Sequence, residues 1–173
     1  MSTRIEANYK NLERASSWVV NADTKASLIL AFNGGLFAHL MTKTPEIKTL
    51  LIKQGLGISS FILLVISGLF ILFFILSITN CFRTIRPSLN AKTPSMFYFG
   101  TIQNLSLDIF KQKMKSLDED SIEDELINQT HIVSTVAYKK FTAVRKALNN
   151  MVMSLIFWGV ILLAINLFQR KGG

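Results

Sequence analysis

Residues 58–78 read ISSFILLVISGLFILFFILSI, a run of 21 residues with one glycine, no proline and no charge. As an α-helix this run is roughly 31 Å long, which matches the hydrocarbon core of a bilayer. A single segment crosses that core only as a helix, because each backbone N–H and C=O group must find its partner within the segment. The alternative is a buried helix of a soluble protein, but such helices rarely lack charge on every face for so long. The run therefore predicts a membrane protein.

Two further apolar runs predict two more membrane spans. Residues 26–41 form a run of 16 residues, and residues 151–168 form an uncharged run of 18 that ends before Arg170 and Lys171. The predicted fold class is an all-α membrane protein with three transmembrane helices, whose long helices extend into a cytoplasmic helical region. The expected segments are an amphipathic N-terminal helix (1–25), a first span (26–41), an extracytoplasmic loop (42–54), a second span (55–80), a cytoplasmic helical region (81–150), a third span (151–168) and a tail (169–173).

The distribution of lysine and arginine predicts how these spans are oriented. Of the 19 basic residues, fourteen fall in residues 1–25 and 81–150, and five fall in residues 42–54 and the tail. Basic residues are enriched on the cytoplasmic side of membrane proteins. The N-terminus and residues 81–150 are therefore expected in the cytoplasm, with the C-terminus outside, although Arg170 and Lys171 fit this orientation less well.

Composition and motif content argue against an enzyme. Too little chain remains outside the spans for a separate catalytic domain of Rossmann size. Cys81 is the only cysteine, so neither an intrachain disulfide nor a cysteine-based metal site is expected. The sequence lacks an HExxH motif, a glycine-rich phosphate loop and a GxSxG motif. No catalytic residue, metal or cofactor is predicted, and the net charge of +8 fits either cytoplasmic anchoring or an anionic ligand.

The polar region after the second span is expected to be helical with breaks. Pro87 and Pro94 interrupt helix at its start. A short helix is expected over residues 102–115, and a long one over residues 121–168. Asp120 is predicted to cap the long helix, because a carboxylate suits a helix N-terminus.

The long helix carries the candidate ligand-binding residues. Its expected apolar stripe consists of Leu126, Val133, Val136, Ala137, Val144 and Ala147. Gln129 and Lys140 fall within that stripe, and a lysine there is costly unless it is paired, solvated or bound to an anion. Two interpretations of Lys140 stay open: an ion pair with an acidic residue of a neighbouring helix, or a contact with a nucleotide phosphate. Lys140 also lies seven residues from Val133 and from Ala147, a spacing typical of paired helices.

Three basic neighbours of Lys140 complete the candidate ligand-binding set. Lys139, Arg145 and Lys146 add positive charge close to it in the sequence. A nucleotide phosphate is one possible partner for them, and the headgroups of the inner leaflet are the other. His131 has no second potential ligand four residues away, which makes a metal site there a poor interpretation.

The candidate pore or gating residues lie at and within the first span. Asp23 and Lys25 are charged where that span begins, and charged groups at a membrane edge often mark functional sites. A local salt bridge at the interface is the alternative. Asn33 stands in mid-span beside Gly34 and Gly35, where it either lines a pore or takes part in ordinary helix packing.

Three groups of residues carry a resemblance to a known family. The first is Trp18 with NADTKAS at residues 21–27 and an apolar run into Asn33-Gly34. The second is Pro94 with FYFGTI at residues 97–102. The third consists of Leu126, Gln129, Ser134, Ala137, Lys140, Phe141 and Arg145, leading into the last apolar helix. Together, in this order and over nearly the whole chain, they resemble Pycsar-type transmembrane effectors, which are small bacterial antiphage membrane proteins.

The resemblance implies a multi-pass protein of the bacterial inner membrane that responds to a nucleotide signal. Opening a pore would depolarise the membrane and cause abortive infection. A similar architecture occurs in the effector of the Hailong defence system, a channel held shut by an oligodeoxyadenylate that a partner nucleotidyltransferase makes. The chain has no room for a separate β-roll domain that binds cyclic nucleotides, so the cytoplasmic helices are the expected ligand surface.

The expected partners follow from the same resemblance. They are the lipid bilayer, further copies of the chain (a tetramer being the favoured assembly) and a cyclic nucleotide or oligodeoxynucleotide from a partner cyclase or nucleotidyltransferase. Duplex nucleic acid is not expected. Three rival functions remain. They are a holin-like pore that needs no ligand, a membrane scaffold that recruits a soluble partner without conducting ions, and a membrane-embedded enzyme, for which the sequence offers no set of catalytic residues.

Overall fold

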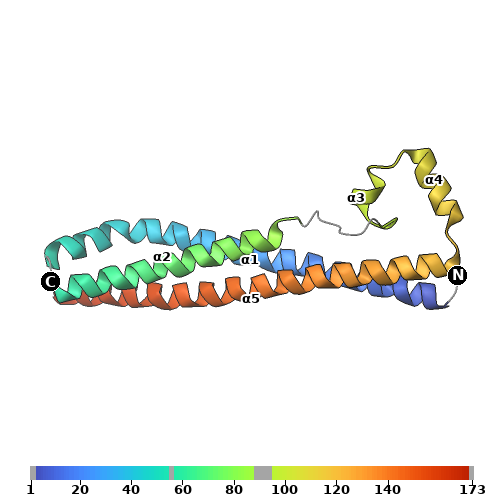
Figure 1. Ribbon diagram of the computed structural model, residues 1–173. Helices are drawn as coiled ribbons and strands as arrows, with labels where there is room; N and C mark the ends of the chain where they lie inside the picture. Colours follow the sequence, from blue (N-terminus) through green and yellow to red (C-terminus); the bar gives the residue numbers. More distant parts are fainter. Residues whose placement is uncertain (1–2, 55–56, 88–94, 172–173) are drawn as a thin grey trace. The chain divides into compact units, whose positions relative to one another are not determined.

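The computed structural model describes residues 3–54, 57–87 and 95–171 (Figure 1). Its helices are α1 (Thr3–Gln54), α2 (Ile58–Ile85), α3 (Phe99–Ile102), α4 (Leu107–Ser116) and α5 (Glu119–Lys171). Within these ranges no β-strand occurs, which confirms the all-α class. The β-roll nucleotide-binding architecture is therefore not present in the described part of the chain.

Two helices are long and apolar enough to cross a bilayer. They are α2 and, within α5, the segment Glu119–Phe168. In their most apolar windows only 17% and 22% of the residues are buried, whereas the core helix of a soluble protein is mostly buried. This exposure of apolar side chains supports the prediction of a membrane protein. Residues 26–41, which lie within α1, do not meet the same criterion.

The chain divides into two compact units, which are described separately. The polar unit comprises Met1–Asp23 and Arg86–Phe141, and the apolar unit comprises Thr24–Ile85 and Thr142–Gly173. The two long helices each contribute to both units, and α2 lies in the apolar unit.

In the polar unit α1 and α5 run parallel. Asn8 donates a hydrogen bond to Glu123 (3.4 Å), and Lys140 donates one to Asp23 (2.6 Å), so residue numbers rise together along both helices. The buried residues on these two faces are Ile5, Ala15 and Ala22 of α1, and Leu126, Gln129, Ala137 and Lys140 of α5. The distances between them in sequence are sums of steps of three and four residues, which is the spacing of two helices that pack along one seam. The seam predicted on α5 is therefore confirmed.

Helix α1 contributes two alanines to this seam in addition to Ile5. Ala15 and Ala22 are its most buried positions in the polar unit, at 1% and 0% exposure. Alanine has no side-chain bulk beyond Cβ, so it lets a second helix approach closely. The small side chains carry no hydrophobic signal strong enough to reveal them in advance.

In the apolar unit the three helical segments enclose an aromatic and aliphatic core. Its buried residues are Leu36, Leu50, Leu63, Phe70, Trp158, Ile161 and Ile165. The Phe70 ring lies 5.4 Å from the Trp158 ring and 5.8 Å from the Phe74 ring, measured between centroids. Such separations are typical of stabilising aromatic pairs. Cys81, one helical turn after Ser77 on α2, is completely buried.

The expected loop at residues 42–54 is wrong, because α1 continues through it to Gln54. Pro45 lies inside this helix and removes one backbone hydrogen bond. Thr49 donates its hydroxyl hydrogen to the Pro45 carbonyl oxygen (2.9 Å), and Ile47 and Leu50 pack on the core. Burial of these apolar side chains offsets the cost of the proline.

The segment after the second span also differs from expectation. Helix α2 continues to Ile85, just before Pro87, and Pro94 lies outside the described residues. The single helix expected over residues 102–115 is two helices, α3 and α4. Ser106 separates them, because its Oγ accepts the Ile109 amide (3.4 Å) and caps α4.

The start of α5 is fixed by Asp118 and not by the predicted Asp120. Helix α5 begins at Glu119, and Asp118 Oδ1 accepts a hydrogen bond from the Ser121 amide (2.9 Å). Hydrogen bonding from the Ser121 side chain, and next from its amide, lowers the pKa of Asp118. The predicted cap was two residues too late because several adjacent carboxylates are all suitable by residue type.

We expect Asp118→Ala to increase fraying of the first turn of α5, and Asp120→Ala to leave it unchanged. The hydrogen-exchange protection of the Ser121 amide measures this difference. Because the pKa of Asp118 is lowered, its contribution is present above its ordinary value of 3.8 and is lost as pH falls through the folded-state pKa. Equal protection in wild type and Asp118→Ala at neutral pH would contradict the assignment.

Candidate functional site

An ion pair between Lys140 and Asp23 is the main polar contact of the polar unit. The 3–4 spacing of the seam turns Lys140 toward α1, where its Nζ lies 2.6 Å from Asp23 Oδ1. The Lys140 side chain is 10% exposed and that of Asp23 is 36% exposed. Of the two interpretations of Lys140, the structure shows the ion pair. A phosphate reaches this ammonium only by competing with Asp23.

Gln129 is buried in the same seam, at 7% exposure. It lies eleven residues before Lys140, or about 16 Å along the helix. The structure therefore does not bring these two candidates together for a ligand as small as a mononucleotide. The burial of Gln129 is that of a residue that packs between two helices.

The three remaining basic candidates are accessible. Lys139 is exposed on the polar unit, next to the buried Lys140. Arg145 and Lys146 are exposed on the apolar unit. Their accessibility allows contact with an anion, either a phosphate ligand or a lipid headgroup.

In the apolar unit, Asn33 is the centre of a buried hydrogen-bond relay. Its Nδ2 donates to the Ile29 carbonyl oxygen and to Ser77 Oγ, both at 3.0 Å. Ser77 Oγ in turn donates to the Ala147 carbonyl oxygen at 3.0 Å. The relay connects α1, α2 and α5, and all three of Asn33, Ser77 and Ala147 are fully buried.

This relay supports the packing interpretation of Asn33. The side chain is enclosed by three helices of one chain, so it would reach a pore only if those helices separated. Two acceptors on Nδ2 fix the amide orientation and leave Oδ1 as a buried acceptor without a hydrogen-bond partner. Sequence reasoning missed Ser77, although an isolated serine in an apolar helix is itself a signal of a contact between helices.

The other two gating candidates, Asp23 and Lys25, differ in exposure. Lys25 is exposed on α1, whereas Asp23 is engaged with Lys140. Gly34 and Gly35 are exposed, and a Cβ atom built on either meets nothing within 4 Å. Within the described residues, no other helix approaches either glycine closely.

Comparison with known proteins connects these features to one family. Residues 8–165 match the family PycTM, whose description is the Pycsar effector protein domain. The chain belongs to the PycTM family. The Pycsar effector protein GmPycTM of Gulbenkiania mobilis is 32% identical over 179 aligned residues, which cover 87% of each chain. No solved structure matches the chain.

Membership of the PycTM family confirms the resemblance found in the sequence. It identifies the chain as an effector of antiphage defence that is a membrane protein. Pycsar effectors respond to cyclic nucleotide signals from a cyclase partner, and the family is one of effectors rather than of known enzymes. The match includes residues of both the polar and the apolar unit.

We expect the Lys140–Asp23 pair to stabilise the fold by about 1–2 kcal/mol, since it is only partly screened by water. Lys140→Met and Asp23→Asn should each lower the melting temperature of the purified protein, and the double variant should lose less than the sum. Lys139→Met, which changes an exposed neighbour, is the matched control. Additive losses in this double-mutant cycle would show that the two groups do not interact.

We expect Ser77→Ala to destabilise the apolar unit by about 0.5–1.5 kcal/mol, because it removes one acceptor from Asn33 and one donor from the Ala147 carbonyl. Ser59→Ala alters an exposed serine of the same helix and should have little effect. Thermal unfolding in detergent, followed by circular dichroism, compares the two variants. A Ser59→Ala loss as large as that of Ser77→Ala would argue against the relay.

Proposed function

We propose that the chain is an effector of the bacterial inner membrane that assembles into a homo-oligomeric, ion-conducting pore gated by a nucleotide-derived ligand. The opened pore depolarises the membrane and ends infection with the death or arrest of the cell. The observation that carries the proposal is the PycTM match over residues 8–165, because it joins the polar unit and the membrane-crossing helices in one effector domain. A tetramer is the favoured assembly.

The proposed topology has three spans, with α1 supplying the first over residues 26–41. Its outward side chains Leu28, Phe32, Phe37 and Met41 are all exposed, and a bilayer would cover them. Contacts of α1 with α2 support this placement: Asn33 bonds to Ser77, and Phe37 stacks on Phe74 at 6.3 Å between ring centroids. The distribution of basic residues supports a cytoplasmic location for the N-terminus and residues 81–150.

The proposed gate is the Lys140–Asp23 pair of the polar unit. A phosphate of the ligand replaces Asp23 as the partner of Lys140, and the exposed Lys139 adds a second charge-assisted contact. A ligand shifts an equilibrium only through different affinities for its two states. The pair provides that difference, because the phosphate binds well only when Asp23 has moved away. Gln129 is assigned to packing.

Arg145 and Lys146 are assigned first to the headgroups of the inner leaflet. They are exposed, and they precede the uncharged residues 151–168 of α5. Basic residues beside a membrane span are attracted to anionic lipids. A cyclic nucleotide is the preferred ligand class because Pycsar effectors respond to such signals. An oligodeoxynucleotide is the second choice.

Ion flux from liposomes that contain the purified protein tests this proposal. The panel consists of the four 3′,5′-cyclic nucleotides that carry the RNA bases. We expect the flux to depend on one of them. Lys139→Glu should raise the concentration for half-maximal flux by about tenfold, the effect of one lost charge-assisted contact. Lys115→Glu, an exposed charge reversal on α4, should not change it.

Other outcomes select the rival functions. Flux without any nucleotide would indicate a holin-like pore. No flux under any condition, together with a stable soluble protein partner, would indicate a scaffold. If an oligodeoxynucleotide alters the flux and no cyclic nucleotide does, the ligand would be the oligodeoxynucleotide. Binding unchanged by Lys140→Met would remove Lys140 from the ligand site.

A further inference from the structure

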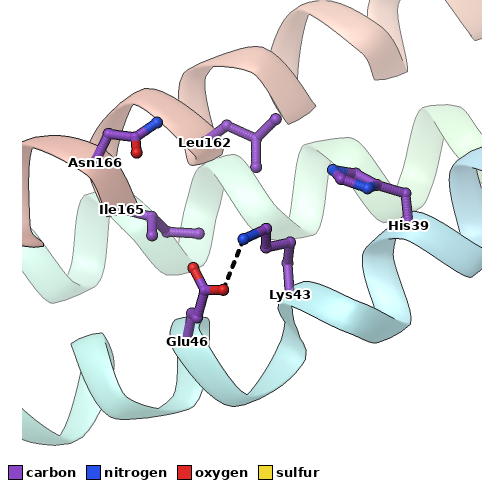
Figure 2. A pocket seen from close by; sticks show the side chains of 6 residues that line it. All are labelled: His39, Lys43, Glu46, Leu162, Ile165 and Asn166. Atoms are coloured by element: carbon purple, nitrogen blue, oxygen red, sulfur yellow. Dashed lines mark hydrogen bonds and ion pairs between the residues drawn. The ribbon is translucent and has the colours of Figure 1, made fainter.

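A cavity of about 350 Å³ lies between α1 and α5 in the apolar unit, and none of its lining residues is used above for the nucleotide. It is lined by His39, Lys43, Glu46, Leu162, Ile165 and Asn166 (Figure 2). Figure 2 shows the charged side chains of α1 extending toward the apolar side chains of α5. Its volume falls within the range of small-molecule sites.

The polar wall of this cavity offers both signs of charge side by side. Lys43 Nζ lies 2.6 Å from Glu46 Oε1, and each side chain is 33% exposed. An ammonium group has three N–H donors and a carboxylate has two oxygens, so neither group is confined to a single partner. The pair presents a donor and an acceptor at adjacent positions of one wall.

His39 and Asn166 extend this wall with further polar groups. The His39 ring packs edge-on against Trp158, with centroids 5.6 Å apart, which fixes the imidazole beside the cavity. Asn166 stands on the α5 side (Figure 2). Both side chains provide N–H groups that suit an anion, while Leu162 and Ile165 supply an apolar floor.

The cavity lies close to one end of the membrane-crossing part of α5. Leu162 and Asn166 precede Lys171, the last residue of α5, by nine and five residues, or about 14 and 8 Å of helix. The polar headgroup layer of a bilayer is roughly 5–8 Å deep on each side of the hydrocarbon core. Leu163 and Leu167, beside the cavity on α5, are 63% and 60% exposed and available to acyl chains.

We propose that this cavity binds the headgroup of a membrane phospholipid that carries a phosphodiester and a primary amine. The phosphodiester lies against Lys43 and the N–H groups of His39 and Asn166. The primary ammonium lies against Glu46, and the acyl chains follow the exposed leucines of α5. The ligand's two opposite charges complement the two charges of the wall.

The charges of the wall disfavour the competing ligand classes. A nucleotide with several phosphates meets the Glu46 carboxylate as well as Lys43, and like charges repel. An anionic lipid without an amine satisfies Lys43 but leaves Glu46 next to its phosphate. A quaternary amine cannot donate a hydrogen bond to Glu46. The site is thus selective for a primary amine beside a phosphate.

Native mass spectrometry of the purified full chain, with defined lipids added in detergent, tests the proposal. We expect phosphatidylethanolamine to bind about tenfold more tightly than phosphatidylcholine or phosphatidylglycerol. Lys43→Ala should weaken phosphatidylethanolamine binding about tenfold, and Lys48→Ala, an exposed lysine five residues further along α1, should leave it unchanged. Circular dichroism checks that each variant keeps its helices.

Glu46→Gln provides the second, independent arm. It should abolish the preference for phosphatidylethanolamine over phosphatidylcholine without abolishing binding of either. Glycerophosphoethanolamine, which has the headgroup without acyl chains, should compete only at much higher concentration. Competition equal to that of the lipid would mean a soluble phosphoamine site and would overturn the lipid assignment.

Three results would overturn the proposal as a whole. They are equal binding of the three lipids, equal losses in Lys43→Ala and Lys48→Ala, or an unchanged lipid preference in Glu46→Gln. If Lys43→Ala does not fold, the Glu46→Gln result decides. None of these outcomes bears on the nucleotide-dependent flux, which depends on Lys139 and Lys140 in the other unit.

Discussion

The structure depends on a requirement of the bilayer: a polar group taken out of water must find its partner inside the protein. Helix α2 has few such groups, and hydrogen bonds to its own helix or to its neighbours satisfy several of them. Ser77 bonds to Asn33 and to the Ala147 carbonyl, and Thr84 bonds back to the Asn80 carbonyl. The polar contacts hold three apolar segments together where hydrophobic burial provides little preference between lipid and protein.

The same logic distinguishes two kinds of polar residue at seam positions. Asn33 is fully enclosed, and its Nδ2 has fixed acceptors at the Ile29 carbonyl of its own helix and at Ser77 of α2. Lys140 is also nearly buried, but its partner Asp23 is partly exposed and can be hydrated when the pair opens. The first arrangement specifies which helices pack together. The second leaves a nearly buried charge that would need a new partner if Asp23 moved away, and the proposed gate uses this property.

Sequence reasoning succeeded where a pattern extended over many residues of one helix. The uncharged run at residues 58–78 and the 3–4 spacing around Lys140 both follow from helix periodicity, and both are confirmed. It failed where several local choices were nearly equal in energy. Asp118 and Asp120 are equally good caps by residue type, and Pro45 stays helical only because distant residues bury its neighbours.

The sequence identified which residue types would matter at the candidate site better than it identified the residues that they contact. The sequence indicated that Lys140 needs a counter-charge, but the pairing with Asp23 depends on α1 and α5 running parallel in register. Ser77 and the small alanines of α1 were missed because their importance comes from closeness between helices. The cavity at Lys43 was hidden by the expectation of a loop, since a loop would not have set Lys43 and Glu46 one turn apart on a helix.

The burial of Cys81 has a practical consequence for work on this chain. The only thiol is at 0% exposure on α2, so water-soluble maleimides should find little to react with while the helices are associated. Cysteines introduced one at a time can then report sidedness without first removing the native one. Conversely, slow labelling of Cys81 itself would register the moments when α2 separates from its neighbours, without any engineered probe.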